Sequence, residues 1–320
     1  MGSPIKLLDR NFEAMTKMAL SYLVQIGLKY DVFRKLEGGA RREEILERIP
    51  VSNRAYLDRL IDSYLSLGIL EAEDGLLRVG DFSYDFSLTG ETVRKLLPDW
   101  IRILEEMYRM ADYAFISPEH PKILMDFDKG ADFWDMRLLM ALNRAYRKLI
   151  IELAGIEDGS RVLDLGCGSV SPVEIGESVG PNGRYVGVDF SPGLLSIAKT
   201  RVRNLGMDWV ILRELDVRRI VPRNTYDVVV MAFLLEYLPE REDVVNLALS
   251  MLNPGGRIVI IDPFRDRYEL LPALEFFESL TPEFVSFPSI EGIVDAVERG
   301  PHDVRVEVHG GSAILITKHS

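Results

Sequence analysis

The second half of the chain alternates short apolar runs with amphipathic segments, and this alternation constrains the fold more than any other feature. Two of the runs, DVVVMA (227–232) and RIVIID (257–262), carry apolar side chains at consecutive positions. Strands of this kind are typical of a parallel sheet that is covered by helices on both faces. We therefore expect an α/β fold, a doubly wound Rossmann-like sheet, in this half of the chain.

Seven strands follow from the pattern, and we expect them at residues 161–165, 184–188, 209–212, 226–231, 257–261, 304–308 and 313–317. Helices are expected between them, among others at 192–204 and 241–252. Only the residues HGG (309–311) separate the last two strands, which is too short for the crossover that joins parallel strands. The last strand should therefore run antiparallel to its neighbour.

The first 88 residues have a different, mainly helical pattern. Apolar residues recur at helical spacing near the N-terminus and again at 53–67, a helix that Ser52 could cap, and Asp74-Gly75 then suits a tight hairpin turn. The order of helix, turn, helix and small hairpin predicts a winged-helix domain at 1–88. Acidic residues offset Arg54 and Arg59 in the helix that would read DNA, so we expect dimerisation rather than DNA binding.

Residues 89–155 are predicted to form a helical linker before the third segment, 156–320. The linker is rich in aromatic residues and methionine, including Trp134 in the stretch DKGADFWDM. Most side chains of this kind form ordinary core, but they also suit irregular apolar ligands. The linker is therefore a candidate lid whose side chains could line a pocket over the sheet.

Composition excludes several classes of partner. The formal net charge of −12 disfavours binding to nucleic acid or to anionic membranes, and no apolar run is long enough to span a bilayer. With one cysteine, Cys167, and four scattered histidines, no metal site is expected. We expect a cytoplasmic protein, and the scarcity of glutamine beside many arginines suggests a thermophilic source.

The stretch VLDLGCGSV (162–170) places a Gly-x-Gly turn at the end of the first strand of the sheet. In such a fold, ligands bind where the parallel strands end, and glycines allow them to approach bare backbone. Asp164 lies two positions before Gly166 and would repel a phosphate, whereas it suits a cationic ligand. The turn therefore indicates a positively charged ligand without phosphate, such as S-adenosylmethionine.

Five segments in this half of the chain resemble, in order, those of class I S-adenosylmethionine-dependent methyltransferases. They are VLDLGCGSV, YVGVDFS, LRELDVRRI, YDVVVMAFLLEYLP and LNPGGRIVIID. The resemblance implies that Asp164 faces the methionine end of the cofactor, that Asp189 binds the ribose hydroxyls and that Asp216 accepts from the adenine amino group. The full set of cofactor-binding residues that it implies is Asp164, Gly166, Cys167, Gly168, Asp189, Phe190, Asp216, Val217 and Phe233.

The order of the three segments also resembles that of small-molecule O-methyltransferases, which dimerise through an N-terminal winged helix. That resemblance implies a homodimer and an acceptor pocket formed partly by the linker. The histidine base of that family is absent, because LLEYLPERED places Glu236 and Tyr237 after the fourth strand. Some stretches are closer to quinone-pathway C-methyltransferases.

We expect a methyltransferase that acts on a small apolar or aromatic acceptor by O- or C-methylation, with Glu236 and Tyr237 as the candidate catalytic residues. Glu236 could equally be a solvated carboxylate at the start of a helix. A protein methyltransferase is one alternative. A second is a non-enzymatic regulator that responds to S-adenosylmethionine through its winged helix.

Overall fold

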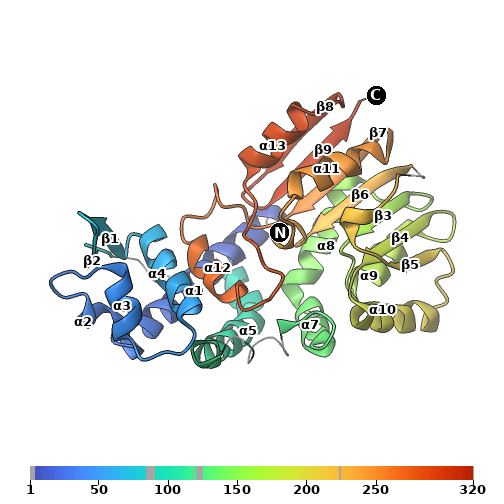
Figure 1. The fold of residues 1–320 in the computed structure, drawn as a ribbon. Helices are drawn as coiled ribbons and strands as arrows, with labels where there is room; N and C mark the ends of the chain where they lie inside the picture. Colours follow the sequence, from blue (N-terminus) through green and yellow to red (C-terminus); the bar gives the residue numbers. More distant parts are fainter. Residues whose placement is uncertain (1–3, 84–90, 118, 120–124, 223–224, 320) are drawn as a thin grey trace. The chain divides into compact units, whose positions relative to one another are not determined.

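The computed structural model describes residues 4–83, 91–117, 119, 125–222 and 225–319 (Figure 1). The chain divides into two compact units. The sheet unit consists of Met1–Asp9, Leu124–Arg267 and Glu283–Ser320, and the helical unit consists of Arg10–Ile123 and Tyr268–Pro282.

The sheet unit is built on a seven-stranded sheet. Its strands are β3 (Arg161–Leu165), β4 (Arg184–Asp189), β5 (Val210–Glu214), β6 (Tyr226–Ala232), β7 (Leu252–Ile261), β8 (Val304–His309) and β9 (Ala313–Lys318). They lie in the order β5-β4-β3-β6-β7-β9-β8. β9 runs antiparallel to both of its neighbours, β7 and β8, and the other pairs of neighbouring strands are parallel. The predicted α/β sheet with an antiparallel last strand is confirmed.

Helices cover the sheet in two groups. One group packs side by side and contains α8 (Ala141–Ala154), α9 (Ser171–Val179) and α10 (Pro192–Asn204). The other contains α11 (Arg241–Ser250) and α13 (Ile290–Glu298), as Figure 1 shows. Strand residues such as Val229, Ile258 and Ile314 are completely buried, because helices on both faces exclude water from consecutive apolar side chains.

The strand order places a switch point at β3, which pairs with β4 on one side and with β6 on the other. The chain leaves these strands in opposite directions across the sheet, so the loops that follow them border a common crevice. Three short elements lie in this part of the unit: α7 (Ala131–Leu138) and the 3-10 helices η1 (Val217–Arg219) and η2 (Leu235–Tyr237).

The helical unit begins within α1 (Pro4–Lys29). It continues through α2 (Val32–Lys35), α3 (Arg42–Arg48), α4 (Arg54–Ser66), β1 (Leu70–Glu73), β2 (Leu76–Val79) and α5 (Glu91–Ile116). The predicted hairpin is present, and both of its turn residues, Asp74 and Gly75, have positive φ angles, of 52° and 75°.

The cap predicted for α4 was wrong by one residue. Asn53 is the N-cap, and its side chain accepts the amide of Tyr56 at 3.3 Å. The backbone amide of Ser52 instead donates to the carbonyl of Phe115 at 3.1 Å. Asparagine caps a helix as well as serine does, and here it occupies the position next to the first helical residue.

One helix of the helical unit comes from far along the sequence. After β7 the chain forms α12 (Leu271–Glu278), which packs on α4 and α5. The ring of Phe276 stacks on that of Tyr56 with centroids 4.6 Å apart.

The predicted linker is divided between the two units, because α5 belongs to the helical unit whereas α7 and α8 belong to the sheet unit. The predicted boundary at residue 88 lies outside the described residues, as does His120.

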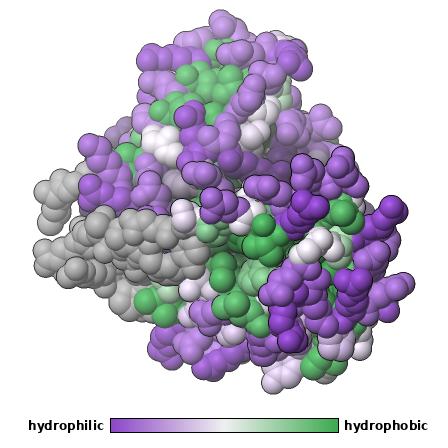
Figure 2. All heavy atoms as spheres, turned by 90° about the vertical axis from the view of Figure 1, so that its left-hand side faces the viewer, coloured by the Kyte–Doolittle hydropathy of each residue, from purple (hydrophilic) through white to green (hydrophobic). Residues whose placement is uncertain are grey.

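The surface is mainly polar on the face shown in Figure 2, where hydrophobic residues form patches between hydrophilic ones. Within the described ranges, no helix has the length and apolar character needed to cross a membrane.

Candidate functional site

The Gly-x-Gly turn after β3 needs both of its glycines. Gly166 and Gly168 have positive φ angles of 73° and 57°, a region that disfavours residues with a Cβ atom. A Cβ on Gly166 would lie 3.0 Å from Leu234 Cδ1, and one on Gly168 would lie 2.9 Å from Leu138 Cδ1. The turn is tied to β4, because the amides of Gly166 and Cys167 donate to the carbonyl of Val188 at 2.8 and 3.1 Å.

Asp164 lies at the start of this turn and is buried. The hydroxyl of Tyr185 donates to Asp164 Oδ2 at 2.5 Å. Burial raises the pKa of Asp164 to about 7, and the negative charge of Asp189 adds to this effect, while the Tyr185 hydrogen bond and Arg147 oppose it. The carboxyl group therefore changes charge near neutral pH, and a bound cation would favour its ionised form.

Asp189 ends β4 and is also buried. Its Oδ2 accepts the amide of Gly168 at 2.8 Å, and its Oδ1 accepts the amide of Ser191 at 2.9 Å. Burial raises the pKa of Asp189, although the backbone hydrogen bonds lower it in part. The structure thus brings the predicted ribose-binding carboxylate against the turn, where backbone amides stabilise its ionised form.

Asp216 lies after β5 and forms an ion pair with its neighbour Arg218. Both carboxylate oxygens take part, because Nε of Arg218 contacts Oδ1 at 3.0 Å and Nη2 contacts Oδ2 at 2.6 Å. The Arg218 hydrogen bonds are the main reason why the pKa of Asp216 is lowered. The predicted partner of the adenine amino group is therefore engaged by an arginine, while Val217 beside it is buried.

Glu236 and Asp262 form a buried carboxyl pair after β6 and β7. Glu236 is 3% exposed and Asp262 is 0% exposed. The two carboxyl groups interact directly with each other, and burial, followed by the charge of Glu236, raises the pKa of Asp262 well above its usual range. The backbone carbonyl of Glu236 also accepts the amides of Val285 and Ser286. Glu236 is thus buried, and the alternative of a solvated carboxylate was wrong.

Asp135 of α7 connects the turn to α10, and sequence reasoning missed it. Ser169 Oγ donates to Asp135 Oδ1 at 2.6 Å, and Arg201 contacts the two carboxylate oxygens at 2.5 and 2.8 Å. Burial opposes ionisation of Asp135, but the hydrogen bonds from Arg201 and Ser169 lower its pKa overall. Asp135 lies in the stretch DKGADFWDM, and its acidic character was the only available signal.

Comparison with known proteins assigns a function class to this arrangement. Residues 156–283 match a family model described as a methyltransferase domain. The protein is a methyltransferase.

Two relatives differ in how much of the sequence they share. An uncharacterized protein of Methanocaldococcus jannaschii is 28% identical over 321 residues, which cover 98% of this chain and 87% of that protein. The demethylmenaquinone methyltransferase of Bacillus cytotoxicus is 29% identical over 141 residues, which cover 42% of this chain and 60% of that enzyme. The similarity to the second relative is therefore confined to part of each chain.

A solved structure of similar fold is that of the CurJ carbon methyltransferase. It has a TM-score of 0.63 at 15% identity and covers 96% of this chain and 91% of that chain. The likeness in fold therefore covers more of the chain than residues 156–283, which match the family model.

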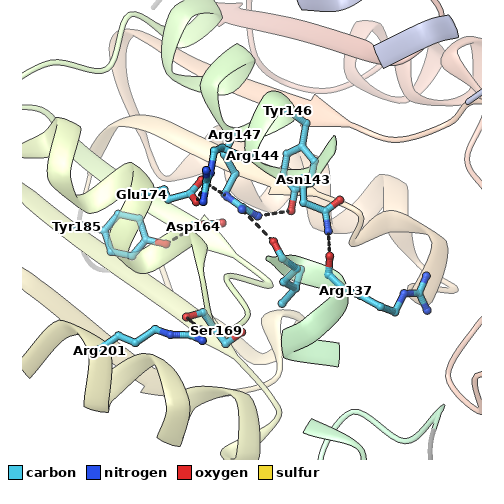
Figure 3. Close-up of polar contacts among 11 residues, drawn as sticks. Arg137, Asn143, Arg144, Tyr146, Arg147, Asp164, Ser169, Glu174, Tyr185 and Arg201 are labelled. Carbon is cyan, nitrogen blue, oxygen red and sulfur yellow. Dashed lines mark hydrogen bonds and ion pairs between the residues drawn. The ribbon is translucent and has the colours of Figure 1, made fainter. Parts of the chain in front are cut away.

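Arg147 of α8 is a completely buried cation whose charge acts on Asp164, beside the Gly-x-Gly turn. Figure 3 shows its guanidinium beside Glu174 and Tyr146. Its Nε lies 2.6 Å from Glu174 Oε2, and its Nη2 lies 2.9 Å from the carbonyl of Leu138. Arg147 fixes the end of α7 against α9, and sequence reasoning did not single it out.

Aromatic rings cluster around Phe127, and one of them belongs to Phe190, the residue that directly follows Asp189. The ring of Phe127 lies 4.3 Å from that of Trp134, 5.0 Å from that of Tyr237 and 5.5 Å from that of Phe190, between centroids. Phe190 is 49% exposed, and Tyr237 also contacts Phe284. The structure thus brings two predicted site residues, Phe190 and Tyr237, to one ring of the linker.

Phe233 follows β6 and adopts a positive φ angle of 52°. Bulky residues rarely adopt this conformation, and such strain is concentrated at functional sites. Its ring lies 4.9 Å from that of Tyr146, and its amide donates to the carbonyl of Ile261. Phe233 is therefore held at the carboxyl edge of the sheet.

Cys167 is buried, and its thiol lies where a Cβ on Gly187 would approach to 2.8 Å. Burial raises the pKa of this thiol well above its usual value, so it is not activated as a nucleophile. In the part of the chain that the structure describes, no group of histidine, cysteine and carboxylate side chains could hold a metal ion.

Proposed function

We propose that the protein transfers the methyl group of S-adenosylmethionine to a small apolar or aromatic acceptor. The observation that carries the proposal is the position of two buried carboxyl groups, Asp164 and Asp189, on either side of a turn with two positive-φ glycines. Such a site suits a ligand with cationic groups and hydroxyls, because buried carboxylates are stabilised by both.

Each part of the cofactor has a matching group in this proposal. Asp164 faces the methionine end, where burial makes its carboxyl group responsive to a nearby cation. Asp189 binds the ribose hydroxyls, and the backbone of Gly166, Cys167 and Gly168 contacts the ligand directly. Burial beside charged groups makes each of these interactions stronger than in water.

The contacts that we propose for the adenine group differ from those predicted from the sequence. Because Arg218 already holds the carboxylate of Asp216, we propose that Val217 and the half-exposed ring of Phe190 cover the adenine faces. Phe233 contributes through the strained backbone after β6. Asp216 then acts mainly by fixing η1, because it accepts the backbone amide of Arg218 at 3.0 Å.

The aromatic cluster of Phe127, Trp134, Tyr237 and Phe284 supports an apolar or aromatic acceptor. Aromatic rings bind planar ligands by offset or edge-to-face contacts. Two of the proteins compared are named for related chemistry, a demethylmenaquinone methyltransferase and a carbon methyltransferase. These names favour methylation at carbon, with O-methylation as the alternative.

Methyl transfer mainly requires the acceptor to be held in line with the methyl group and, where needed, to lose a proton. We propose Glu236 as the group that takes this proton, since it is buried at the carboxyl edge of the sheet. Tyr237 positions the acceptor through its ring, which contacts Phe127 and Phe284.

We further propose that the helical unit supplies a winged-helix dimer interface. The order of α3, α4 and the β1–β2 hairpin supports it. A regulator that binds DNA is disfavoured, because Arg42 lies 2.6 Å from both Asp58 and Asp62 and its charge is neutralised. A protein methyltransferase is the remaining alternative, and the measurement below distinguishes it.

The test uses methyl-labelled S-adenosylmethionine and a cell extract separated into organic-soluble, small polar, protein and nucleic-acid fractions. We expect label in the organic-soluble fraction. Asp189→Ala should lose this transfer, whereas Asp208→Ala, which removes an exposed carboxylate of the same unit, should retain it. Label in protein or nucleic acid would contradict the proposed acceptor class, and label in no fraction would contradict the proposed reaction.

A further inference from the structure

Two carboxyl groups meet at the edge of the sheet where the acceptor is proposed to bind. Asp262 directly follows Ile261, which pairs with Ala232 of the neighbouring strand, and Glu236 lies four residues after Ala232. The two carboxyl groups interact directly with each other and are almost completely excluded from water. Two buried carboxylates in contact cannot both ionise at low cost, so such a pair holds a proton between them.

The surroundings of the pair do not neutralise it fully. Arg241 of α11 is the cation whose charge acts on Asp262, and its guanidinium donates to the carbonyl and to Oγ of Ser286. The backbone of Leu235 lowers the pKa of Asp262 in part, and the amide of Asp262 donates to the carbonyl of Ser312 at 3.1 Å. Ser312 Oγ in turn donates to Asp9, the other carboxylate on this side.

We propose that Glu236 and Asp262 share one proton and together accept the proton that the acceptor loses during methyl transfer. Glu236 is the catalytic residue that faces the acceptor, and Asp262 is a positioning residue that acts through Glu236. The inference rests on the proposed function. It also narrows the substrate class, because the acceptor must carry a weakly acidic O–H or C–H, as phenols, enols and hydroquinone rings do.

The step balances in atoms and charge. The acceptor oxygen or carbon forms a bond to the methyl carbon, and the bond from that carbon to sulfur breaks with its electron pair passing to sulfur. The sulfonium becomes a neutral thioether, and the proton of the acceptor passes to Glu236. The pair starts with one proton and ends with two, so one proton must return to solvent before the next turnover.

Infrared spectroscopy tests the shared proton without requiring any activity. The wild-type protein should show the C=O stretch of a protonated carboxyl group near neutral pH, in addition to the band of Asp164. This band should change in position or intensity in both Glu236→Gln and Asp262→Asn, because each variant removes one of the two groups that share the proton. Glu240→Gln, which removes an exposed carboxyl group three residues after Tyr237, should keep it.

The pH dependence of kcat tests the role in the reaction. Asp262→Asn removes the shared proton that stabilises the ionised form of the pair, so the acid limb of the profile should move to higher pH by about one unit. Its kcat at neutral pH should fall about 10- to 100-fold, with an unchanged KM for S-adenosylmethionine, because Glu236 loses the group that positions it. Glu240→Gln should leave both quantities unchanged.

The outcomes separate the two proposals. An unchanged infrared band in both variants, or an unchanged acid limb in an active Asp262→Asn enzyme, would overturn the shared proton. If either variant fails to fold, the band in the other decides. Absence of methyl transfer by the wild-type protein would overturn the proposed function, and with it the role of the pair as a base, even if the band shows that a proton is shared.

Discussion

The carboxylate of Asp189 accepts the backbone amide of Gly168 at 2.8 Å, across 21 positions of sequence. This hydrogen bond joins the turn after β3 to the end of β4, so the two loops that are proposed to hold the cofactor form one structural element. Asp189 thus has two roles. It fixes the shape of the turn through a backbone amide, and it is placed to accept the ribose hydroxyls.

Binding of S-adenosylmethionine should depend on pH through Asp164. Its pKa is about 7 in the protein without ligand, and a cation beside it favours the ionised form. Below about pH 7 the carboxyl group must therefore lose a proton when the cofactor binds. The affinity for S-adenosylmethionine should then fall by up to about tenfold for each unit by which the pH decreases. Calorimetry in buffers of different ionisation enthalpy should detect the released proton.

Asp164→Asn is the control for this linkage, and it should bind with nearly pH-independent affinity. The raised pKa also predicts a stability effect. The protonated group favours the folded state at low pH, and this contribution is lost as pH rises from 3.8 to about 7. Compared with wild type, ligand-free Asp164→Asn should therefore gain stability at about pH 8 relative to about pH 5. If the difference in stability between Asp164→Asn and wild type is the same at both pH values, the raised pKa of Asp164 is contradicted.

Gly168→Ala should lower stability for two separable reasons. The residue has a φ angle of 57°, and the new Cβ would lie 2.9 Å from Leu138 Cδ1. The φ angle alone should cost about 1–2 kcal/mol. Gly206→Ala is the matched control, because its φ angle is 66° and nothing lies within 4 Å of the new Cβ.

Thermal or denaturant unfolding should place Gly168→Ala below Gly206→Ala in stability, and Leu138→Ala should reduce the additional loss. If the two glycine variants are equally stable, the contact between Leu138 and the turn is not tight.

The ion pair of Asp135 and Arg201 should couple α7 to α10. A double-mutant cycle with Asp135→Asn and Arg201→Met should give a coupling free energy of unfolding of about 1–3 kcal/mol, because the pair is mostly buried and also binds Ser169. The exposed pair Asp295 and Arg299 should give less than about 1 kcal/mol in the same measurement.

The direction in which the coupling free energy between Asp135 and Arg201 changes with pH follows from the lowered pKa of Asp135. Its contribution should be present at neutral pH and should be lost as pH falls below the usual range of an aspartate. A coupling no larger than that of the exposed pair would show that α7 is not held by this contact.

Much of the sheet could be predicted from the sequence, because consecutive apolar residues can be buried on both faces of only a few architectures. Residues 161–165 were predicted as a strand with the bounds that β3 has, and the short HGG connection predicted the direction of β9. Asp164, Gly166 and Asp189 were found for the same reason, since strand ends locate the site in this fold.

Contacts between distant segments could not be predicted in this way. Asp135 meets Arg201 across 66 positions, and Arg147 meets Glu174 across 27, without any local pattern that marks them. The helix α12 was also missed, because its apolar residues pack on helices more than 150 positions earlier. Asp216 was predicted to bind the ligand. Its partner Arg218 lies only two residues away, and the sequence was compatible both with ligand binding and with an ion pair between these two residues.

Calorimetric titration of wild type and Asp189→Ala with S-adenosylmethionine tests the central claim most directly. We expect one site per chain in wild type and an affinity about 10- to 100-fold lower in the variant, since hydrogen bonds to a charged group contribute about 1.5–3 kcal/mol. Asp208→Ala should bind as wild type does. Equal affinity of wild type and a folded Asp189→Ala would contradict the account, because the cofactor would then not lie at the ends of β3 and β4.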